Sequence, residues 1–498
     1  MLIAANLGLP GGYQSTCPQH LISGCSGMFR RLFLILTALS LSFAKAADDK
    51  PNIILFLADD LGWTGLSCFE SDLYETPHLD KLAAGGMKFT DAHSACTVCS
   101  PSRAAIMTGM TPAQLHLTTF IAGQNRPYAK LNIPDWTLGL KGSYTTVAEA
   151  LKVGGYRTWQ IGKWHLDFPG STVGPTGHGF DFARDRPEGS RGHFLSKEAV
   201  EELALETNYA TDYFGKLAAK KINEKSADPF FLYLAFHVPH TPVTGREDLV
   251  EYFEGKITDN LVHNNPHYAA MVKSMDDAVG NVVTALKETG QFDNTLIIFT
   301  SDNGGLTQRN GKHDNFTENL PLRRGKGSAF EGGTRVPTIV YWPGKIEAGT
   351  TCDEPIMGID FYPTLLEITG IEGSAEQNQL IEGVSIKALL EDPNATIDRD
   401  LYWHFPHYHA GGDSPYSSIK AKDWRLVEFF EDGGSIELYN LKDDISESLD
   451  LSATNPEIAQ DLHQRLKQWR RDVGAQMMTE NPNFDPERQG ETARRKKK

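Results

Sequence analysis

The sequence predicts an α/β fold with a mostly parallel sheet flanked by helices, followed by a smaller α+β subdomain. Two observations support this prediction: short apolar runs alternate with segments of helical period over most of the chain, and the runs become shorter from about residue 396. Such alternation is typical of a parallel sheet, and nearly continuous apolar runs are typical of strands covered on both faces. The predicted buried strands are 52–57, 157–161, 230–236, 296–300 and 338–342.

Two segments between these runs carry helical signals. Thr146 and Glu149 have the spacing of a capping box, which marks a helix start, and Gly154 is a suitable stop. A second helix is expected from about His267 to Leu286, because its apolar residues recur on one face every three to four positions. That face carries Met271, Met275, Val279 and Val282.

The last quarter of the chain has a different pattern. Apolar segments at 401–403, 424–428 and 436–439 indicate short antiparallel strands, and a helix is expected from about Pro456 to Val473. The sequence then ends in the basic run Arg494–Lys498, which favours disorder. We therefore predict an α/β domain over residues 47–395, an α+β subdomain over 396–485 and a disordered basic tail over 486–498.

The N-terminal residues resemble a secretory signal peptide that begins at Met28. Arg30 and Arg31 precede an apolar run, and Ala44-Lys45-Ala46 has the form of a cleavage site. The apolar run, 32–43, is short for a membrane span, so no stable span is expected, and a retained anchor is the alternative. We predict a signal peptide over residues 1–46, with an over-extended start before Met28, and a secreted or periplasmic protein.

Composition disfavours two classes of protein, general nucleic-acid binders and disulfide-rich scaffolds. The 498-residue chain has a formal net charge of −16, which disfavours general nucleic-acid binding. The mature chain keeps Cys68, Cys96, Cys99 and Cys352, too few for a disulfide scaffold in a chain of this length. One bridge is compatible with this count.

Acidic and amide side chains follow two of the predicted strands. Asp59 and Asp60 come after the first strand, and Asp302 and Asn303 follow the run at 296–300. The carboxyl ends of parallel strands meet at one edge of a sheet, where ligands bind. A cluster of oxygen ligands suits a hard divalent cation, Ca²⁺ or Mg²⁺. Each pair taken alone is also a common turn sequence.

Basic side chains follow the other strands. Lys163 and His165 lie in Gly-Lys-Trp-His, His240 follows the run at 230–236, and Lys326 lies in Gly-Lys-Gly. Together with a cation, such groups form a cradle for a tetrahedral oxyanion. Cys99 stands near a predicted helix start marked by Pro101, where backbone amides also favour anions.

The sequence at this cysteine resembles a known family. Cys99-Ser100-Pro101-Ser102-Arg103, with Thr108-Gly109 downstream, resembles the C-x-P-S-R…T-G signature of the type I sulfatases, within the alkaline phosphatase-like superfamily. The resemblance extends over nearly the whole mature chain and implies the alkaline phosphatase-like fold. It also disfavours the alternative that Cys96 and Cys99 form a redox Cys-x-x-Cys pair.

The resemblance implies a cofactor, a modification and a set of site residues. A separate maturase would oxidise Cys99 to formylglycine (3-oxoalanine), and Ca²⁺, or Mg²⁺, would be bound. The implied metal ligands are Asp59, Asp60, Cys99 in its oxidised form, Asp302 and Asn303. The implied catalytic residues are Cys99, Arg103, Lys163, His165, His240 and Lys326. A serine that the family has beyond Gly-Lys-Trp-His has three candidates here, Ser171, Ser190 and Ser196.

The mechanism implied by the resemblance begins with the hydrated aldehyde at position 99, one hydroxyl of which attacks sulfur. The metal, Lys163, Lys326 and Arg103 would stabilise charge on the sulfuryl oxygens. His240, with Lys326, would protonate the leaving alcohol. His165 would take the proton of the second hydroxyl as sulfate leaves and the aldehyde re-forms.

The expected substrate is a sulfated carbohydrate, of galactose or N-acetylhexosamine type by resemblance. His404 and His407 lie in an aromatic, histidine-rich segment and are expected to contact the sugar, with a structural role as the alternative. Two other functions stay open at this point. One is a phosphoester or phosphonate monoester hydrolase of the same superfamily, and the other is a non-catalytic binder of sulfated glycans.

Overall fold

This computed structural model describes residues 14, 50–309, 312–313, 315–412 and 414–493. The predicted signal peptide therefore lies outside the described residues, apart from Gln14, and so does the basic run 494–498. From Lys50 onward the described chain forms one compact unit. Within the described ranges, no helix combines the length and apolarity that a membrane crossing needs.

The core of this unit is a mixed, mostly parallel sheet, as predicted. In the described part of the chain it has eight strands in the order β12-β2-β11-β8-β1-β7-β5-β6. The segment from β8 to β6 is parallel, whereas β11 runs antiparallel to both of its neighbours. The strands are β1 (Asn52–Asp59), β2 (Met87–Phe89), β5 (Arg157–Gly162), β6 (Phe182–Arg184), β7 (Phe230–Pro239), β8 (Thr295–Ser301), β11 (Thr338–Tyr341) and β12 (Thr350–Cys352).

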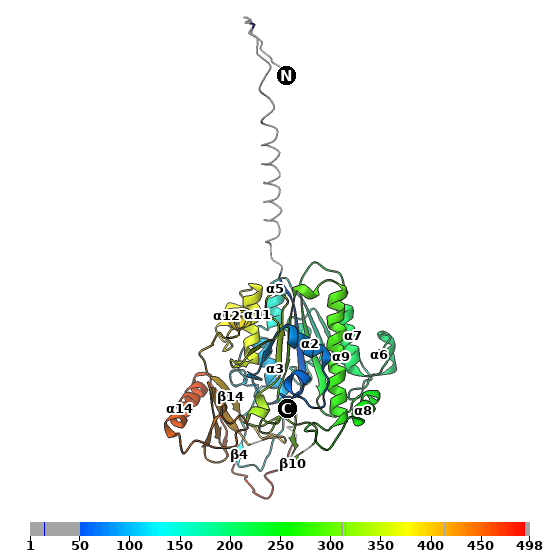
Figure 1. Cartoon of the computed structure of the whole chain (residues 1–498). Helices are drawn as coiled ribbons and strands as arrows, with labels where there is room; N and C mark the ends of the chain where they lie inside the picture. Colours follow the sequence, from blue (N-terminus) through cyan, green and yellow to red (C-terminus); the bar gives the residue numbers. More distant parts are fainter. Residues whose placement is uncertain (1–13, 15–49, 310–311, 314, 413, 494–498) are drawn as a thin grey trace. The chain divides into compact units, whose positions relative to one another are not determined.

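Helices cover both faces of the sheet (Figure 1). Alternate residues of β1 divide between the two cores, since Ile54 and Phe56 face one side and Ile53 and Leu55 the other. The first face packs against α2 (Pro77–Gly85), α7 (Ala210–Ile222) and α9 (Pro266–Glu288). The second face packs against α3 (Cys99–Thr108), α5 (Val147–Val153), α11 (Phe361–Thr369) and α13 (Lys387–Glu391). Burial of both faces explains the continuous apolar runs of the central strands.

The local helix signals are confirmed. Thr146 caps α5, because its hydroxyl accepts the Glu149 backbone N–H at 3.1 Å and the Glu149 carboxylate accepts that of Thr146 at 2.7 Å. The helix ends at Gly154, as expected. The long helix α9 starts one residue before the predicted segment, at Pro266, after an Asn265 cap.

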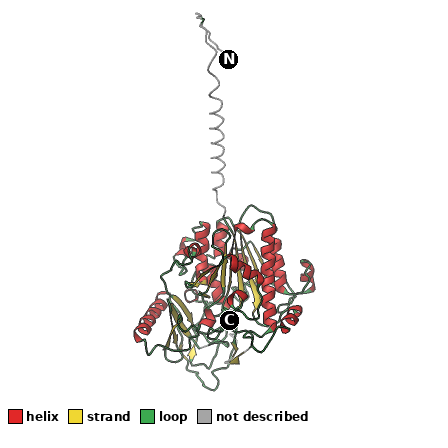
Figure 2. Cartoon of the chain, in the orientation of Figure 1, coloured by secondary structure: helices red, strands yellow, loops and turns green. Residues whose placement is uncertain are grey.

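The last quarter of the described chain forms a four-stranded antiparallel sheet with one helix packed on it (Figure 2). The elements are β14 (Leu401–Phe405), β15 (Tyr416–Ala421), β16 (Trp424–Phe429), β17 (Ser435–Asn440) and α14 (Pro456–Asp472). The sequence analysis missed β15, whose Tyr-Ser-Ser-Ile-Lys-Ala sequence lacks a continuous apolar run. The α+β subdomain is confirmed, and the boundary between residues 395 and 396 stays a prediction.

Short elements complete the described chain. The two-residue strands pair as β3 (Ala92–His93) with β13 (Ile356–Met357), β4 (Leu131–Asn132) with β18 (Thr479–Glu480), and β9 (Gln308–Arg309) with β10 (Lys312–His313). The short helices are α4 (Pro112–Leu115), α6 (Lys197–Glu202), α8 (Glu247–Glu254), α10 (Glu331–Thr334) and α12 (Ala375–Asn378). Single 3₁₀ turns occur at Ser67–Phe69, Pro175–His178, Phe292–Asn294 and Gly358–Asp360.

The expected disorder from residue 486 onward does not hold for residues 486–493. Ala493 and Asn125 exchange backbone hydrogen bonds of 2.8 and 3.2 Å, and the Arg488 guanidinium lies 3.5 Å from the centre of the Tyr128 ring. The physical reason is that the insertion after α3 offers backbone groups and an aromatic face for this segment to pair with. A local reading of the tail sequence cannot detect that partner.

A buried ion-pair network joins the small sheet to the α/β part. Arg425, on β16, is fully buried and pairs with Glu331 at the start of α10. The same guanidinium donates to the Ala329 carbonyl at 2.6 Å and lies 3.6 Å from a carboxylate oxygen of Glu447. Breaking a buried pair leaves an uncompensated charge, which costs far more than losing a surface pair.

We therefore expect Arg425→Met to lower the free energy of unfolding by about 3–5 kcal/mol, because Glu331 would stay buried without this partner. Urea unfolding followed by tryptophan fluorescence measures the change. The exposed Arg471→Met on α14 is the matched control, with an expected change within about 0.5 kcal/mol. Equal effects of the two substitutions would contradict the assigned role of Arg425.

Candidate active site

The carboxyl ends of the parallel strands surround a cavity of about 830 Å³. Strand register explains why the predicted residues meet there. Ala58 is level with Ser301 on β8, and Asp59 is level with Pro239 on β7, so Asp302 and His240 follow directly beside Asp59. The site is therefore a direct consequence of the central strand pairing.

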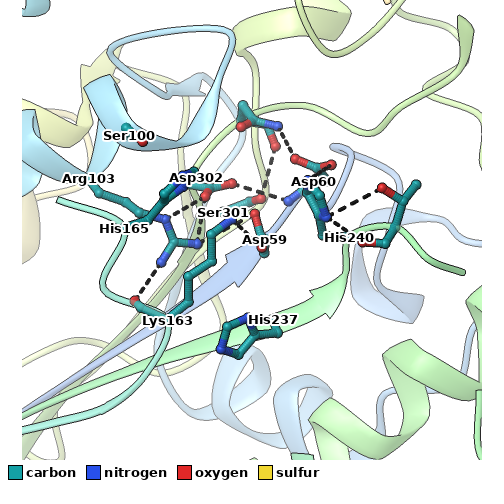
Figure 3. Close-up of polar contacts among 12 residues, drawn as sticks. Asp59, Asp60, Ser100, Arg103, Lys163, His165, His237, His240, Ser301 and Asp302 are labelled. Atoms are coloured by element: carbon teal, nitrogen blue, oxygen red, sulfur yellow. Dashed lines mark hydrogen bonds and ion pairs between the residues drawn. The ribbon is translucent and has the colours of Figure 1, made fainter. Parts of the chain in front are cut away.

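Three buried carboxylates form the centre of the site (Figure 3). Asp59, Asp60 and Asp302 are each at most 2% exposed. The Asp60 backbone N–H donates to Asp302 Oδ1 at 3.2 Å. Asn303 joins the cluster by donating from Nδ2 to Asp60 Oδ1 at 2.8 Å.

Three cationic side chains surround these carboxylates. Lys163 Nζ lies 2.6 Å from Asp59 Oδ2, and Lys326 Nζ lies 2.6 Å from Asp60 Oδ1. Arg103 comes from α3 and donates from Nε to Asp302 at 2.8 Å. The second Arg103 terminal nitrogen lies 2.6 Å from the same carboxylate. Each carboxylate thus has a different cation as its main partner.

The backbone geometry before Lys163 requires a glycine. Gly162 ends β5 with a φ of +92°, and a Cβ atom there would stand 1.9 Å from the Ala235 carbonyl oxygen of β7. Glycine alone adopts this conformation without strain and fits this close approach. The turn directs the next residue, Lys163, into the cavity wall.

Burial and charge set opposite pKa shifts within the carboxylate cluster. Burial alone would raise the pKa of Asp59, but the nearby cations, led by Lys163, hold that pKa well below its usual value. Burial raises the pKa of Asp302 to about 7, since the Arg103 charge offsets only part of that rise and the Asp59 charge adds to it. Asp302 therefore takes up a proton more readily than Asp59 does.

The carboxylate cluster fits a divalent cation bound by oxygen ligands. Asp59 Oδ1 and Asn303 Oδ1 are buried acceptors with no hydrogen-bond donor among the described residues. One ligand atom each from Asp59, Cys99 and Asp302 lies within 4.8 Å of the others. A hard cation such as Ca²⁺ would coordinate these unpaired oxygens and would stabilise the ionised form of Asp302.

Cys99 is the first residue of α3, and its side chain lines the cavity. It is 3% exposed, and the following residues up to Thr108 are buried as well. Burial raises the pKa of the Cys99 thiol in spite of the nearby Lys163 and Lys326. The unmodified thiol therefore stays protonated and is a weak nucleophile.

Two of the predicted histidines also line the cavity, each with one ring nitrogen bound to a backbone carbonyl. His165 Nε2 lies 2.7 Å from the Ile121 oxygen, and His240 Nδ1 lies 2.7 Å from the Thr241 oxygen. A carbonyl only accepts, so these nitrogens carry the protons. Burial and the charge of Lys163 lower the pKa of His165 to about 3, and burial with Lys326 lowers that of His240.

The cavity has further lining residues that the sequence analysis did not assign to the site. Asp185, Arg186 and His193 come from the loop after β6, and His409 comes from the segment after β14. His237, at the end of β7, also lines the cavity and lies 2.6 Å from Asp185. No motif surrounds these residues, so the sequence carried no signal for them.

None of the three candidate serines lines the cavity in the described part of the chain. Ser196 caps α6 by accepting the Ala199 N–H at 3.4 Å, and Ser190 donates to the Pro187 carbonyl at 2.6 Å. The Ser171 hydroxyl accepts the Val173 N–H at 3.2 Å. All three serve local turns or caps.

The placement of His404 and His407 corrects the expected sugar contact. Both side chains are buried and neither lines the cavity. His404 bonds to Ser417 and to the Gln476 carbonyl, each at 2.7 Å, and His407 bonds to Thr118 at 2.7 Å. The ring nitrogens of His404 and His407 are therefore bound inside the protein, to β15 and the Gln476 backbone and to the insertion after α3. His409, from the same segment, lines the cavity instead.

Comparison with known proteins agrees with this geometry. The Sulfatase family profile matches residues 51–371, more than half of the chain. The profile for the C-terminal region of N-sulphoglucosamine sulphohydrolase matches residues 325–472. Both matched ranges lie within the described compact unit.

Individual relatives give the same result. A sulfatase of Formosa agariphila is 30% identical, over 85% of this chain and 89% of its own. The N-acetylgalactosamine-6-sulfatase of Rattus norvegicus is 32% identical, over 77% and 74%. The solved structure of Ps i-CgsB in complex with k-i-k-neocarrahexaose superposes with a TM-score of 0.70 at 29% identity, covering 88% of this chain and 95% of the other.

A phosphonate monoester hydrolase of Agrobacterium radiobacter has a TM-score of 0.60 at 20% identity, which shows a shared fold alone. The extent of the family match and of the full-length relatives settles the class of the protein. The chain therefore belongs to the type I sulfatase family and is a sulfuric ester hydrolase with an alkaline phosphatase-like fold.

Proposed function

We propose that this enzyme removes sulfate from a sulfated carbohydrate, using formylglycine formed from Cys99 and a bound divalent cation, Ca²⁺. The observation that carries the proposal is the position of Cys99, at the start of a helix and beside Asp59 and Asp302. Lys163 and Lys326 line the same cavity. A sulfuryl group reaching Cys99 would therefore lie in a cavity lined by two cations.

The substrate class rests on the relatives and on the cavity rim. One structural relative was solved with k-i-k-neocarrahexaose, and another relative is an N-acetylgalactosamine-6-sulfatase. Phe120 and His409, whose rings lie 6.0 Å apart edge to face, give the rim an aromatic surface of the kind that sugar rings pack against. We therefore propose a sulfated galactose or N-acetylhexosamine unit as the substrate.

The burial of Cys99 bears on its conversion to formylglycine. A separate maturase would need to contact the Cys99–Arg103 stretch, which is inaccessible in the folded chain. Conversion must therefore take place before α3 docks onto the sheet. The hydrated aldehyde supplies one hydroxyl as the nucleophile and a second hydroxyl through which sulfate is released.

The four oxygen-bearing side chains Asp59, Asp60, Asp302 and Asn303 would hold the cation, which would supply charge to activate the nucleophile and to neutralise a sulfuryl oxygen. Lys163 and Lys326 bind the remaining sulfuryl oxygens, since their ammonium groups already lie in the wall of the cavity. Arg103 is turned away from solvent and fixes the Asp302 carboxylate and the Lys163 carbonyl.

The histidines have complementary tasks in proton transfer. His165 holds its Nε2 proton on the Ile121 carbonyl, so neutral Nδ1 is the atom that accepts a proton when sulfate leaves. His240 holds its Nδ1 proton on Thr241, and Nε2 lies 3.7 Å from Asp60. Lys326, whose pKa is raised by Asp60, shares that carboxylate and is the protonated group on this side of the site. It supplies the proton for the leaving oxygen, and Nε2 of neutral His240 can accept that proton and pass it on.

The sequence supports a location outside the cytoplasm, where sulfated polysaccharides are met, and we propose a periplasmic or secreted enzyme on that basis. A preference for phosphate esters is the competing outcome. Turnover of a sulfated sugar, measured against the phosphate ester of the same sugar, decides between them. A strong preference for the phosphate ester would overturn the proposal.

We expect the peptide that contains position 99 to show the mass of formylglycine or its hydrate when the protein is purified from its own host. Cys99→Ala should abolish turnover of sulfate esters, because no nucleophile remains. Cys96→Ala is the matched control, since Cys96 is equally buried but does not line the cavity. An unmodified thiol in protein that still hydrolyses sulfate esters would contradict the role of Cys99.

Lys326→Ala should lower kcat for a sulfate ester by ~10²–10³-fold, the usual loss for one preorganised charge-stabilising group. Steady-state kinetics on a sulfated monosaccharide measures the loss. Lys345→Ala removes an exposed lysine outside the cavity and should leave kcat unchanged. A similar kcat for both variants would exclude Lys326 from the site.

Ca²⁺ added to protein first stripped with a chelator should stabilise the folded state, because the cation would offset the charge repulsion among the buried carboxylates. At about 100 times its dissociation constant the gain is about 2.7 kcal/mol, visible as a higher midpoint of thermal unfolding. Asp302→Asn should reduce this gain, whereas Asp472→Asn, exposed on α14, should retain it. Equal gains in both variants would mean that the cation binds elsewhere.

A further inference from the structure

One wall of the cavity comes from the loop between β6 and α6, a segment that no motif singled out. Asp185, Arg186 and His193 of this loop line the cavity beside His237 and His240. Asp185 and Arg186 are exposed, whereas His193 is only 3% exposed. His193 is therefore the interior group of this wall.

The backbone around His193 is held on both sides. Arg191 and Phe194 exchange hydrogen bonds of 2.8 and 3.0 Å, which closes a tight turn around the histidine. The His193 carbonyl accepts the N–H of Ala210, the first residue of α7, at 2.8 Å. A side chain on such a braced turn is well placed to fix a ligand.

The contacts of His193 assign its tautomer. Nε2 lies 3.1 Å from the His240 carbonyl oxygen, which only accepts, so Nε2 carries the proton. Burial lowers the pKa of His193 to about 4, and the ring is neutral near pH 7. Nδ1 is therefore an acceptor, and it is buried with no hydrogen-bond donor among the described residues.

A buried acceptor without a donor costs free energy, so this position favours a ligand that donates a hydrogen bond. An anionic sulfuryl oxygen has no proton to donate and would be repelled by the Nδ1 lone pair. A sugar hydroxyl is a donor of the right type. His193 also contacts the backbone of His240, the residue assigned to the leaving-oxygen side, so the hydroxyl it binds lies near the scissile ester.

We propose that His193 is a specificity-determining residue whose Nδ1 accepts a hydrogen bond from a free hydroxyl of the sulfated sugar, next to the ester that is cleaved. This inference rests on the proposed function and narrows its substrate class. The preferred substrate has an unmodified hydroxyl beside the sulfate ester. Aryl sulfates, which lack such a hydroxyl, gain nothing from this contact.

Two substitutions separate the acceptor from the contact with His240. His193→Gln can place an amide N–H near the position of Nε2 and keep the bond to the His240 carbonyl, but it loses the Nδ1 acceptor. His193→Asn can place an amide oxygen near the position of Nδ1 but loses the bond to His240. Both are assayed with a sulfated monosaccharide, with the same sugar methylated on its neighbouring hydroxyl, and with para-nitrophenyl sulfate.

For the wild type we expect methylation of the hydroxyl to lower kcat/KM by ~10–100-fold, as for loss of one buried hydrogen bond. His193→Gln should lower kcat/KM for the free sugar by a similar factor and then show no further loss on methylation. Its loss on the aryl sulfate should be much smaller. His193→Asn should keep discriminating between the free and the methylated sugar.

His116→Gln is the matched control, because His116 also binds a backbone carbonyl through Nε2, at 3.0 Å from Gly474, but lies outside the cavity lining. This substitution should leave kcat/KM for all three substrates unchanged.

Equal losses of kcat/KM on sugar and aryl sulfate in His193→Gln, or no effect of methylation on the wild type, would overturn the inference while the sulfatase assignment stands. If His193→Gln does not fold, the methylation series on the wild type and His193→Asn still decides. A wild type inactive on every sulfate ester would refute the proposed function itself, and this inference with it.

Discussion

The structure depends on balancing charge where three carboxylates are buried at the ends of the central strands. Asp59, Asp60 and Asp302 cannot all stay ionised in a dry interior unless cations lie against them. Lys163, Lys326 and Arg103 come from the turn after β5, from the loop before α10 and from α3, one for each carboxylate. This requirement ties five distant parts of the chain to one point.

The same balance prepares the site for an anionic substrate. The lysines that neutralise the carboxylates also line the cavity, so their ammonium groups would be available to a sulfuryl group if a divalent cation neutralised the carboxylates instead. The histidines are arranged differently, because backbone carbonyls fix the proton of His165, His193 and His240 on one ring nitrogen. The other nitrogen of His165 and of His193 has no hydrogen-bond donor among the described residues, and that of His240 lies 3.7 Å from Asp60.

The α+β subdomain contributes to the rim more than to the chemistry. Arg425 locks its sheet to Glu331, close to the loop that carries Lys326. His409 and Thr492 bring two separate parts of the C-terminal region to the cavity. The rim is thus assembled from segments that the catalytic residues do not need, which is where enzymes of one fold differ in substrate.

The sequence alone determined the central strands, the acidic and basic strand ends and the motif at Cys99. These are local signals, and parallel strands bring their carboxyl ends to one edge of the sheet. Only the tertiary structure decided which side chains form the rest of the cavity wall. It buries His404 and His407, replaces them with His409, and adds His193 from a loop without a motif. The physical reason is that side-chain direction in a loop depends on contacts with distant backbone, such as that of Ala210 and His240, which no local pattern records.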